Sequence, residues 1–396
     1  MIDHPAAEVP IVGDDTVPPQ PASRRVESVD LLRGLLMVVM VLDHVREFFT
    51  DVKVDPTDLS VTTPALFFTR WVTHFCAPTF MLLAGLSAFL SGTRKTRGEL
   101  SLYLLSRGLW LILLEQTVES VCVFFTYPHV VLGLVLWAIG WSMIALAGLI
   151  HLPRYLIAGI GVAMIALHNT LDGFAPPRGF AALLWSILHV PGFQLLPGGV
   201  PMLVGYPLIP WVGVMALGYA LGPLFLQPSE RRTPTLFVMG AAMVAGFVTL
   251  RWLNVYGDPR PWAPQPDWTG TVMSFLNCQK YPPSLLYLLM TLGPAFLALA
   301  AFDRGLGRVG HPLRTFGRAP LFFYLLQWPV AHTLAVSAAA GQGYPIGWMF
   351  AFPPFQAPKG YGHSLPAVYL FWVLTLGLLY YPSLWFWEWK QGSKGQ

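Results

Sequence analysis

The chain has 396 residues, of which 55% are hydrophobic and only 11% are charged. A soluble domain has about 25% charged residues, and a soluble protein of this length could not bury so much apolar surface. The mean hydropathy of +0.56 therefore indicates a polytopic membrane protein. These values exclude a soluble enzyme, a disordered protein and a disulfide scaffold. The net charge of +4 gives no reason to expect a nucleic acid as partner.

The sequence divides into one membrane domain and two short tails. Residues 1–23 are rich in Pro, Ala and Asp and contain no apolar core, which predicts a disordered cytoplasmic tail rather than a signal peptide. Residues 24–390 form the predicted membrane domain, and 391–396 form a short cytoplasmic tail. The three cysteines have no metal-type spacing, and we expect no metal.

Ten apolar runs are long enough to cross a hydrocarbon core of about 30 Å. A further run over 180–190 is too short to span and predicts an interfacial or re-entrant segment. The ten predicted spans cover residues 29–49, 66–90, 100–125, 130–150, 155–171, 204–226, 235–253, 284–302, 320–339 and 365–387.

The distribution of basic residues supports an even number of spans. With the N-terminus in the cytoplasm, most of the 24 Lys and Arg residues fall in inner loops or at inner helix ends, as the positive-inside rule requires. The predicted fold class is therefore an all-α integral membrane protein, a polytopic bundle of about ten transmembrane helices with both termini cytoplasmic. The longer loops over 172–203, 254–283 and 340–364 then face outwards, and their prolines predict ordered segments.

The first predicted span carries ionisable residues near both ends, and such residues are functional candidates by default. Arg33 and His44 are 11 residues apart, about 20° from a whole number of turns, so they share one face about 16 Å apart along the axis. That separation is close to the length of an extended pantetheine arm. Asp30 lies one turn before Arg33. The structural alternative is a snorkelling Arg33 and a solvated outer cap over residues 43–47.

Two more pairs of polar residues occur at i, i+4 spacing, which places each pair on one helix face. Arg70 and His74 lie in the outer half of the second span, near the predicted depth of His44. Glu115 and Glu119 lie on the third span, where two carboxylates need cations or protons beside them; Arg46, Arg70 and the histidines are candidate partners. The structural alternatives are an interfacial anchor, hydrogen bonds between helices and a structural ion-pair network.

The residues of the first span resemble the opening of transmembrane acyltransferases. Asp30, Arg33, Gly34 and His44 match the Asp-x-x-Arg-Gly and Arg-x10-His pattern of the acyltransferase-3 group. The fuller resemblance is to the bacterial relatives of heparan-alpha-glucosaminide N-acetyltransferase, domain-of-unknown-function family 1624. It extends over most of the chain and includes residues 42–49, 68–78, 205–211, 280–284 and 317–324.

The resemblance implies an acyl-CoA-dependent N- or O-acetyltransferase in a bacterial inner membrane. Cytosolic acetyl-CoA would donate its acetyl group to an extracytoplasmic glycan or small-molecule acceptor, a sugar amine or hydroxyl. The expected partners are the lipid bilayer, acetyl-CoA and this acceptor, with a homodimer as a candidate assembly. The implied sites are catalytic residues His44, Asp43 and His74, donor-binding residues Arg33 and Asp30, and acceptor-binding residues Arg46, Glu47, Arg70, Glu115 and Glu119.

One departure from the family bears on the catalytic base. In the lysosomal branch the position matching His44 is Asn, with the catalytic His further downstream, whereas here no His lies between Val45 and Thr73. Either His44 or His74 takes the role, and we favour His44 because it shares a face with Arg33. Two other functions were weighed: a transporter or flippase without chemistry, and a metal or haem site at His44, His74 and His332.

Overall fold

The computed structural model describes residues 26–52, 54–127, 129–174, 176, 179–351 and 357–392. The predicted tail over 1–23 lies outside the described residues. At the other end the last helix continues to Gly392, two residues into the segment that was predicted as a tail.

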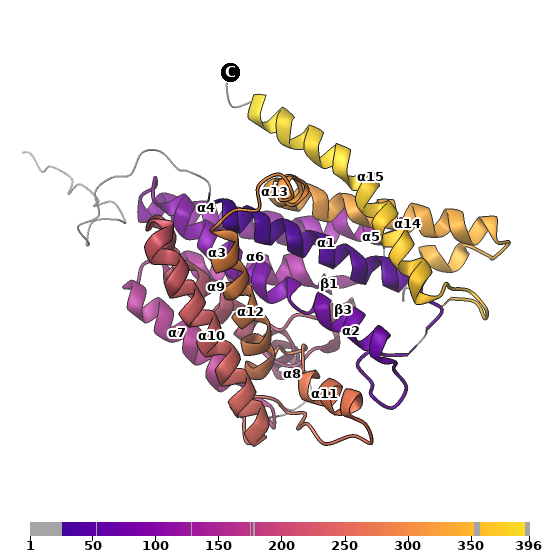
Figure 1. Ribbon diagram of the computed structural model, residues 1–396, viewed down its shortest axis with the longest axis horizontal. Helices are drawn as coiled ribbons and strands as arrows, with labels where there is room; N and C mark the ends of the chain where they lie inside the picture. Colours follow the sequence, from indigo (N-terminus) through magenta and orange to yellow (C-terminus); the bar gives the residue numbers. More distant parts are fainter. Residues whose placement is uncertain are drawn as a thin grey trace, which may run out of the picture.

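Each of the ten predicted spans coincides with a helical segment (Figure 1). A turn at residues 74–75 and a π-helical turn at Glu115–Glu119 each divide one of these segments into two labelled helices. The segments are α1 (Glu27–Phe49), α2 (Pro64–Thr73) with α3 (Cys76–Gly92), α4 (Arg97–Leu114) with α5 (Ser120–Phe124), α6 (Val135–Leu149), α7 (Arg154–Leu167), α9 (Leu208–Ala220), α10 (Ser229–Leu253), α12 (Leu285–Phe302), α14 (Pro320–Gly341) and α15 (Leu365–Gly392).

Seven helices in the described part of the chain are long and apolar enough to cross a membrane, so the chain has the character of an all-α membrane protein. These seven are the segments of α2–α3, α7, α9, α10, α12, α14 and α15. The other three predicted spans coincide with α1 and α4–α5, which carry several charged residues, and with α6, which has 15 residues.

The structure adds elements that the apolar runs do not reveal. α8 (Phe180–Leu188) is the short run that was predicted not to span, while α11 (Trp268–Leu276) and α13 (His311–Arg318) lie between the long helices. A three-stranded sheet of β1 (Val131–Gly133), β2 (Gly192–Leu195) and β3 (Pro201–Val204) has the order β1-β3-β2. The purely helical prediction is therefore incomplete.

The sheet forms where the outer loop over 172–203 folds back on itself. β2 and β3 pair antiparallel, and β1 pairs parallel with β3, with Val131 opposite Met202. Gly198 and Gly199 connect β2 to β3 with φ values of 89° and 80°. Two adjacent glycines with positive φ suit the turn that joins these two strands, which the sequence analysis did not predict.

α1 lies inside the bundle and packs against α2, α3, α12, α13, α14 and α15 (Figure 1). Its closest approach is to α13, because a Cβ added at Gly34 would lie 1.8 Å from the carbonyl oxygen of Leu313. Small residues permit such close packing of backbones within a membrane. The arrangement buries α1 on most faces and places its polar residues among other helices.

Contacts at the two ends of the bundle agree with the predicted alternation of spans. At one end, Ser28 Oγ and the Arg232 guanidinium both donate to Asp303. At the other end, Asn277 donates to the carbonyl of Thr57, and the backbone N–H of Leu285 donates to Asn169. Each contact joins segments that the charge pattern assigns to the same side of the membrane.

Candidate active site

A buried cluster of charges forms where the last turns of α1 and α2 meet. The carboxylate of Asp43 accepts a hydrogen bond from Arg70 and another from Arg46 Nη2 at 3.1 Å. Arg46 also lies 3.6 Å from Glu47, whose side chain is 41% exposed. Burying charged side chains costs free energy because they lose their hydration. Here two arginines lie beside two carboxylates, and their attraction compensates much of that cost.

Local sequence explains how α2 presents Arg70 to this cluster. α2 begins at Pro64, and the Thr63 hydroxyl accepts the backbone N–H of Leu66 as an N-cap, which both residues favour. Arg70 falls in the last turn of α2, where the helix dipole stabilises a cation. The resulting ion pair joins Arg70 to Asp43 on α1, whereas the sequence had suggested the two glutamates of the third span as partners of Arg70.

His44 lies beside this cluster in a half-buried position. Its ring stacks on Trp328 of α14, with centroids 3.9 Å apart and planes inclined by 20°. Nδ1 of His44 has no hydrogen-bond partner among the described residues, while the buried amide of Gln327 lies close to the ring. Stacking on Trp328 fixes the ring, and a neutral imidazole is the side chain best suited to accept a proton near pH 7.

The loop before α12 supplies two further polar side chains. Lys280 acts electrostatically on Asp43, His44 and His74, which places its charge on the same cluster. Burial alone would raise the pKa of Tyr281, but the positive charges of Lys280 and Arg70 outweigh it and hold that pKa below the ordinary value of 10.0. Tyr281 therefore donates more readily than an isolated phenol.

His74, the alternative base, has a different environment. It forms the C-cap of α2 and is only 3% exposed. Its backbone carbonyl accepts the Tyr287 hydroxyl at 2.8 Å, and its ring packs on the same tyrosine with centroids 5.5 Å apart. Because a general base must reach the acceptor, the greater exposure of His44 favours His44 over His74.

Arg33 and Asp30 lie near the opposite end of α1. Arg33 Nη1 donates to Asp30 at 3.2 Å and to the carbonyl of Gly317 at 3.3 Å, and Nη2 donates to Ser87 at 3.2 Å. The guanidinium thereby links α1 to α3 and α13. Its side chain remains 17% exposed, so part of the charge stays accessible from this end.

Glu115 and Glu119 have other partners than the expected cations. Glu115 accepts the backbone N–H groups of Leu134 at 2.5 Å and Trp137 at 2.7 Å, so it caps the first turn of α6. Glu119 accepts the Tyr324 hydroxyl. The two glutamates bound a π-helical turn, Glu115–Glu119, which changes the i, i+4 alignment assumed for a regular α-helix. Their contacts here are to backbone amides and a phenol, and neither Arg46 nor Arg70 bonds to them.

Sequence reasoning missed part of this site. Lys280, Tyr281, Gln327 and Trp328 were not among the candidates. The Lys280-Tyr-Pro-Pro segment carried a signal, because it resembles the family. Its approach to α1 depends on tertiary packing between segments more than 200 positions apart.

The three histidines weighed as a metal or haem site do not come together as ligands. Within the described residues, the grouping of potential ligand atoms excludes His44, His74 and His332. His332 instead forms a hydrogen bond of 2.8 Å with the carbonyl of Val123, and its ring stacks on Phe125 with centroids 4.2 Å apart.

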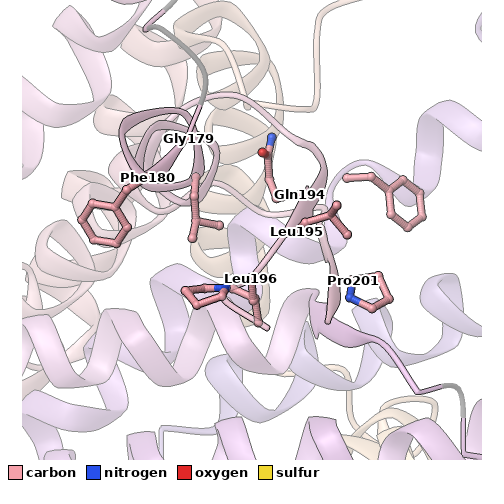
Figure 2. Close-up of a pocket in the computed structure, with 9 residues that line it drawn as sticks. Gly179, Phe180, Gln194, Leu195, Leu196 and Pro201 are labelled. Atoms are coloured by element: carbon pink, nitrogen blue, oxygen red, sulfur yellow. The ribbon is translucent and has the colours of Figure 1, made fainter. Parts of the chain in front are cut away.

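A separate pocket of about 570 Å³ lies between α8 and the β2–β3 hairpin (Figure 2). It is mostly apolar, and none of the candidate site residues lines it. Phe180, Gln194, Leu195 and Pro201 are among its walls. No ionisable side chain is among the residues that line this pocket.

Comparison with known families identifies the chain. The family described as "Heparan-alpha-glucosaminide N-acetyltransferase, catalytic" matches residues 25–256, which include α1 to α10 and thus Arg33, His44, Arg70 and both glutamates. Comparison with curated proteins finds no significant match. The family match covers more than half of the chain, and the chain belongs to the heparan-alpha-glucosaminide N-acetyltransferase-like family of transmembrane acetyltransferases.

Proposed function

We propose that the chain transfers an acetyl group from cytosolic acetyl-CoA to an acceptor on the outer side of a bacterial inner membrane. The observation that carries this proposal is the half-buried His44, which has an unoccupied ring nitrogen beside the cluster of Asp43, Arg46 and Arg70. In this arrangement ten spans cross the membrane, and both termini are cytoplasmic.

Arg33 and His44 divide the work along α1. Arg33, with Asp30, holds the donor near the cytoplasmic end, because a guanidinium binds phosphate oxygens in a bidentate manner. The extended arm of the donor then reaches about 16 Å along the helix to His44. The distance between the two ends of α1 thus matches the need to bring a cytosolic thioester to an outer acceptor.

The chemical step requires a base and a site for negative charge. The acceptor amine or hydroxyl attacks the thioester carbonyl and loses its proton to His44, the new C–N or C–O bond forms, and the C–S bond breaks. The CoA thiolate takes the proton and leaves as a thiol. A neutral imidazole has the basicity for this transfer, and Lys280, Tyr281 and Arg70 can stabilise the oxyanion.

The proposed acceptor contacts are the residues around His44 on the outer side. Glu119 retains an oxygen, Oε2, with no hydrogen-bond partner among the described residues, whereas both oxygens of Glu115 already accept backbone N–H groups. His74 remains the alternative base. Asp43 contributes by forming ion pairs that position Arg46 and Arg70. The proposed acceptor-binding set is Arg46, Glu47, Arg70, Glu115 and Glu119.

Binding of acetyl-CoA to the detergent-purified chain tests the proposal. We expect Arg33→Ala to weaken binding at least tenfold and His44→Ala to leave it unchanged. Arg94→Ala is the matched control, because Arg94 is an exposed arginine outside the helices. Labelled acetyl-CoA also tests for an acetyl-histidine, which His44→Ala would abolish. A folded wild type that does not bind acetyl-CoA but moves a solute across proteoliposomes would instead support a transporter.

A further inference from the structure

A second group of ionisable side chains lies at the outer end of the bundle, away from the residues discussed above. His168, Asp172 and His189 each offer one potential ligand atom, and these atoms all lie within 4.8 Å of one another. His168 and His189 are 2% and 1% exposed, respectively, while the side chain of Asp172 is 23% exposed. Two buried imidazoles thus meet one carboxylate that reaches solvent.

The histidines of this group have unmet hydrogen-bonding capacity. Neither ring nitrogen of His168, nor Nδ1 of His189, has a hydrogen-bond partner among the described residues. The backbone of Pro283 lies near the His168 ring but does not form a hydrogen bond of acceptable geometry. Buried polar atoms are normally satisfied, so an imidazole with both nitrogens unpaired indicates that a ligand belongs there.

Local structure places the three side chains on two different elements. His168 and Asp172 are four residues apart at the end of α7, where the helix tightens into a 3₁₀ turn, His168–Leu171. His189 ends α8, and its backbone N–H donates to the carbonyl of Trp185 at 2.7 Å. The rings of His168 and His189 lie 5.6 Å apart between centroids, so the group joins α7 to α8.

We propose that His168, Asp172 and His189 bind a divalent transition-metal ion, with Zn²⁺ as the best fit, and that a water completes a tetrahedral site. Nε2 of His189 and Oδ1 of Asp172 lie 3.0 Å apart, and without an ion between them they share a hydrogen bond. Two ligands with metal bonds of about 2.0 Å stand roughly 3.3 Å apart in a tetrahedron. Two imidazoles with one carboxylate suit Zn²⁺ better than Mg²⁺ or Ca²⁺, which prefer oxygen ligands.

A neighbouring amide orients the carboxylate. Asn169 Nδ2 donates to Oδ2 of Asp172 at 2.9 Å, which leaves Oδ1 directed to His189. Such outer contacts are typical of protein metal sites because they fix the ligating oxygen. Asn169 Oδ1 in turn accepts the backbone N–H of Leu285 at 2.9 Å, at the first residue of α12.

The bound ion would act as a clamp on the outer surface. It would join the end of α7 to α8 and, through Asn169, to the start of α12 just after Lys280 and Tyr281. The site shares no residue with the proposed active site, so the two proposals stand or fall separately. Its expected effect is on stability and on the order of the loop before α12.

Metal analysis of the full chain in detergent, purified without a polyhistidine tag, tests the proposal. The protein is stripped with EDTA, titrated with ZnCl₂ by calorimetry, and measured for bound zinc after dialysis. We expect one Zn²⁺ per wild-type chain and a higher melting temperature with Zn²⁺ than with Mg²⁺. His168→Ala and His189→Ala should each weaken binding by about a hundredfold or more, since outer-contact losses alone cost about 10- to 100-fold.

His151→Ala is the matched control, because His151 is an exposed histidine elsewhere in the chain, and it should bind Zn²⁺ like wild type. Wild-type protein loaded with Co²⁺ should show the intense visible absorption bands of a tetrahedral ion. This measurement does not depend on whether a variant folds. Wild-type protein that holds no stoichiometric zinc, or zinc that survives in both ligand variants, would overturn the proposal.

Discussion

Asp43 forms ion pairs with two arginines from different helices. These two positive charges explain how a carboxylate can be buried in the bundle. Arg46 is on the same helix at i, i+3 and Arg70 is on α2. Within a low-dielectric interior such a network is stable only when each charge has a partner. His44, the proposed base, is therefore next to a set of paired charges that determines the electric field around its ring.

Asp43→Asn removes the only negative charge that contacts Arg70 in the described residues. We expect a loss of about 3–5 kcal/mol in the free energy of unfolding, because the buried guanidinium of Arg70 loses its counter-charge and Arg46 keeps only Glu47 as a partner. Chemical unfolding in mixed micelles measures this loss. Asp51→Asn is the control, since Asp51 is exposed just beyond α1 and should change stability little. Equal stability of both variants would show that the ion pairs contribute nothing.

At the scale of elements, α1 and α13 are in closer contact than most helix pairs. A Cβ added at Gly317 would lie 1.9 Å from the carbonyl oxygen of Asp30, which mirrors the approach of Gly34 to Leu313. The carbonyl of Gly317 also accepts from Arg33. α13 therefore supports the end of α1 that carries Arg33, which is the proposed donor-binding residue.

Gly34→Ala should separate α1 from α13. Inserting a methyl group into so tight a contact costs about 1–3 kcal/mol, and we also expect weaker acetyl-CoA binding because Arg33 loses its support from Gly317. The melting temperature and the dissociation constant measure the two effects. Gly377→Ala on α15 is the control, since nothing lies within 4 Å of an added Cβ there; matching results for both variants would contradict the tight contact.

The loop over 254–283, which was predicted to be ordered, is fixed by a buried arginine. Arg251 at the end of α10 is 1% exposed, and its guanidinium donates to the carbonyls of Phe275, Arg260, Ser274 and Asn277. The structure gives it the role of fixing the loop that leads to Lys280 and Tyr281.

At the scale of the molecule, one carboxylate joins three long helices at the inner end. Asp303, at the end of α12, accepts from Ser28 on α1 at 2.6 Å and from Arg232 on α10 at 2.7 Å and 2.8 Å. Burial alone would raise the pKa of Asp303, but the hydrogen bonds from Arg232 and Ser28 outweigh it and lower that pKa below the ordinary value of 3.8.

Asp303→Asn should therefore destabilise the chain in a pH-dependent manner. A carboxylate whose pKa is lower in the folded than in the unfolded state stabilises the fold above about pH 4, and this contribution is lost as pH falls through the folded pKa. We expect a deficit of about 1.5–3 kcal/mol at pH 7 that narrows below pH 4. Unfolding curves at several pH values measure it, with the exposed Glu230→Gln as control. If the difference in free energy of unfolding between wild type and Asp303→Asn did not vary with pH, the charge of Asp303 would not be the source of its stabilising effect.

α15 has a different relation to the bundle. Its C-terminal half extends beyond its neighbours (Figure 1). Only 22% of the most apolar 18-residue stretch of this helix is buried. In water such a surface would be unfavourable, whereas lipid tails cover it at no cost. The exposed apolar surface thus agrees with a bilayer as the surrounding solvent.

The sequence by itself determined the helical segments and the family. Long apolar runs form helices in a bilayer, because a helix satisfies its own backbone hydrogen bonds. The family pattern around Arg33 and His44 could be recognised because its residues lie within one short stretch of sequence. The prediction that Arg70 lies near the depth of His44 rested on the position of each residue within its own apolar run.

Only the tertiary structure decided which side chains meet. Glu115 caps α6 instead of pairing with an arginine, Trp328 stacks on His44, and Lys280 reaches the cluster from a distant loop. His168 and His189 come together because α8 folds back on the end of α7. Periodicity fixes the face of a residue on its own helix, but the packing of helices fixes which other helix that face meets.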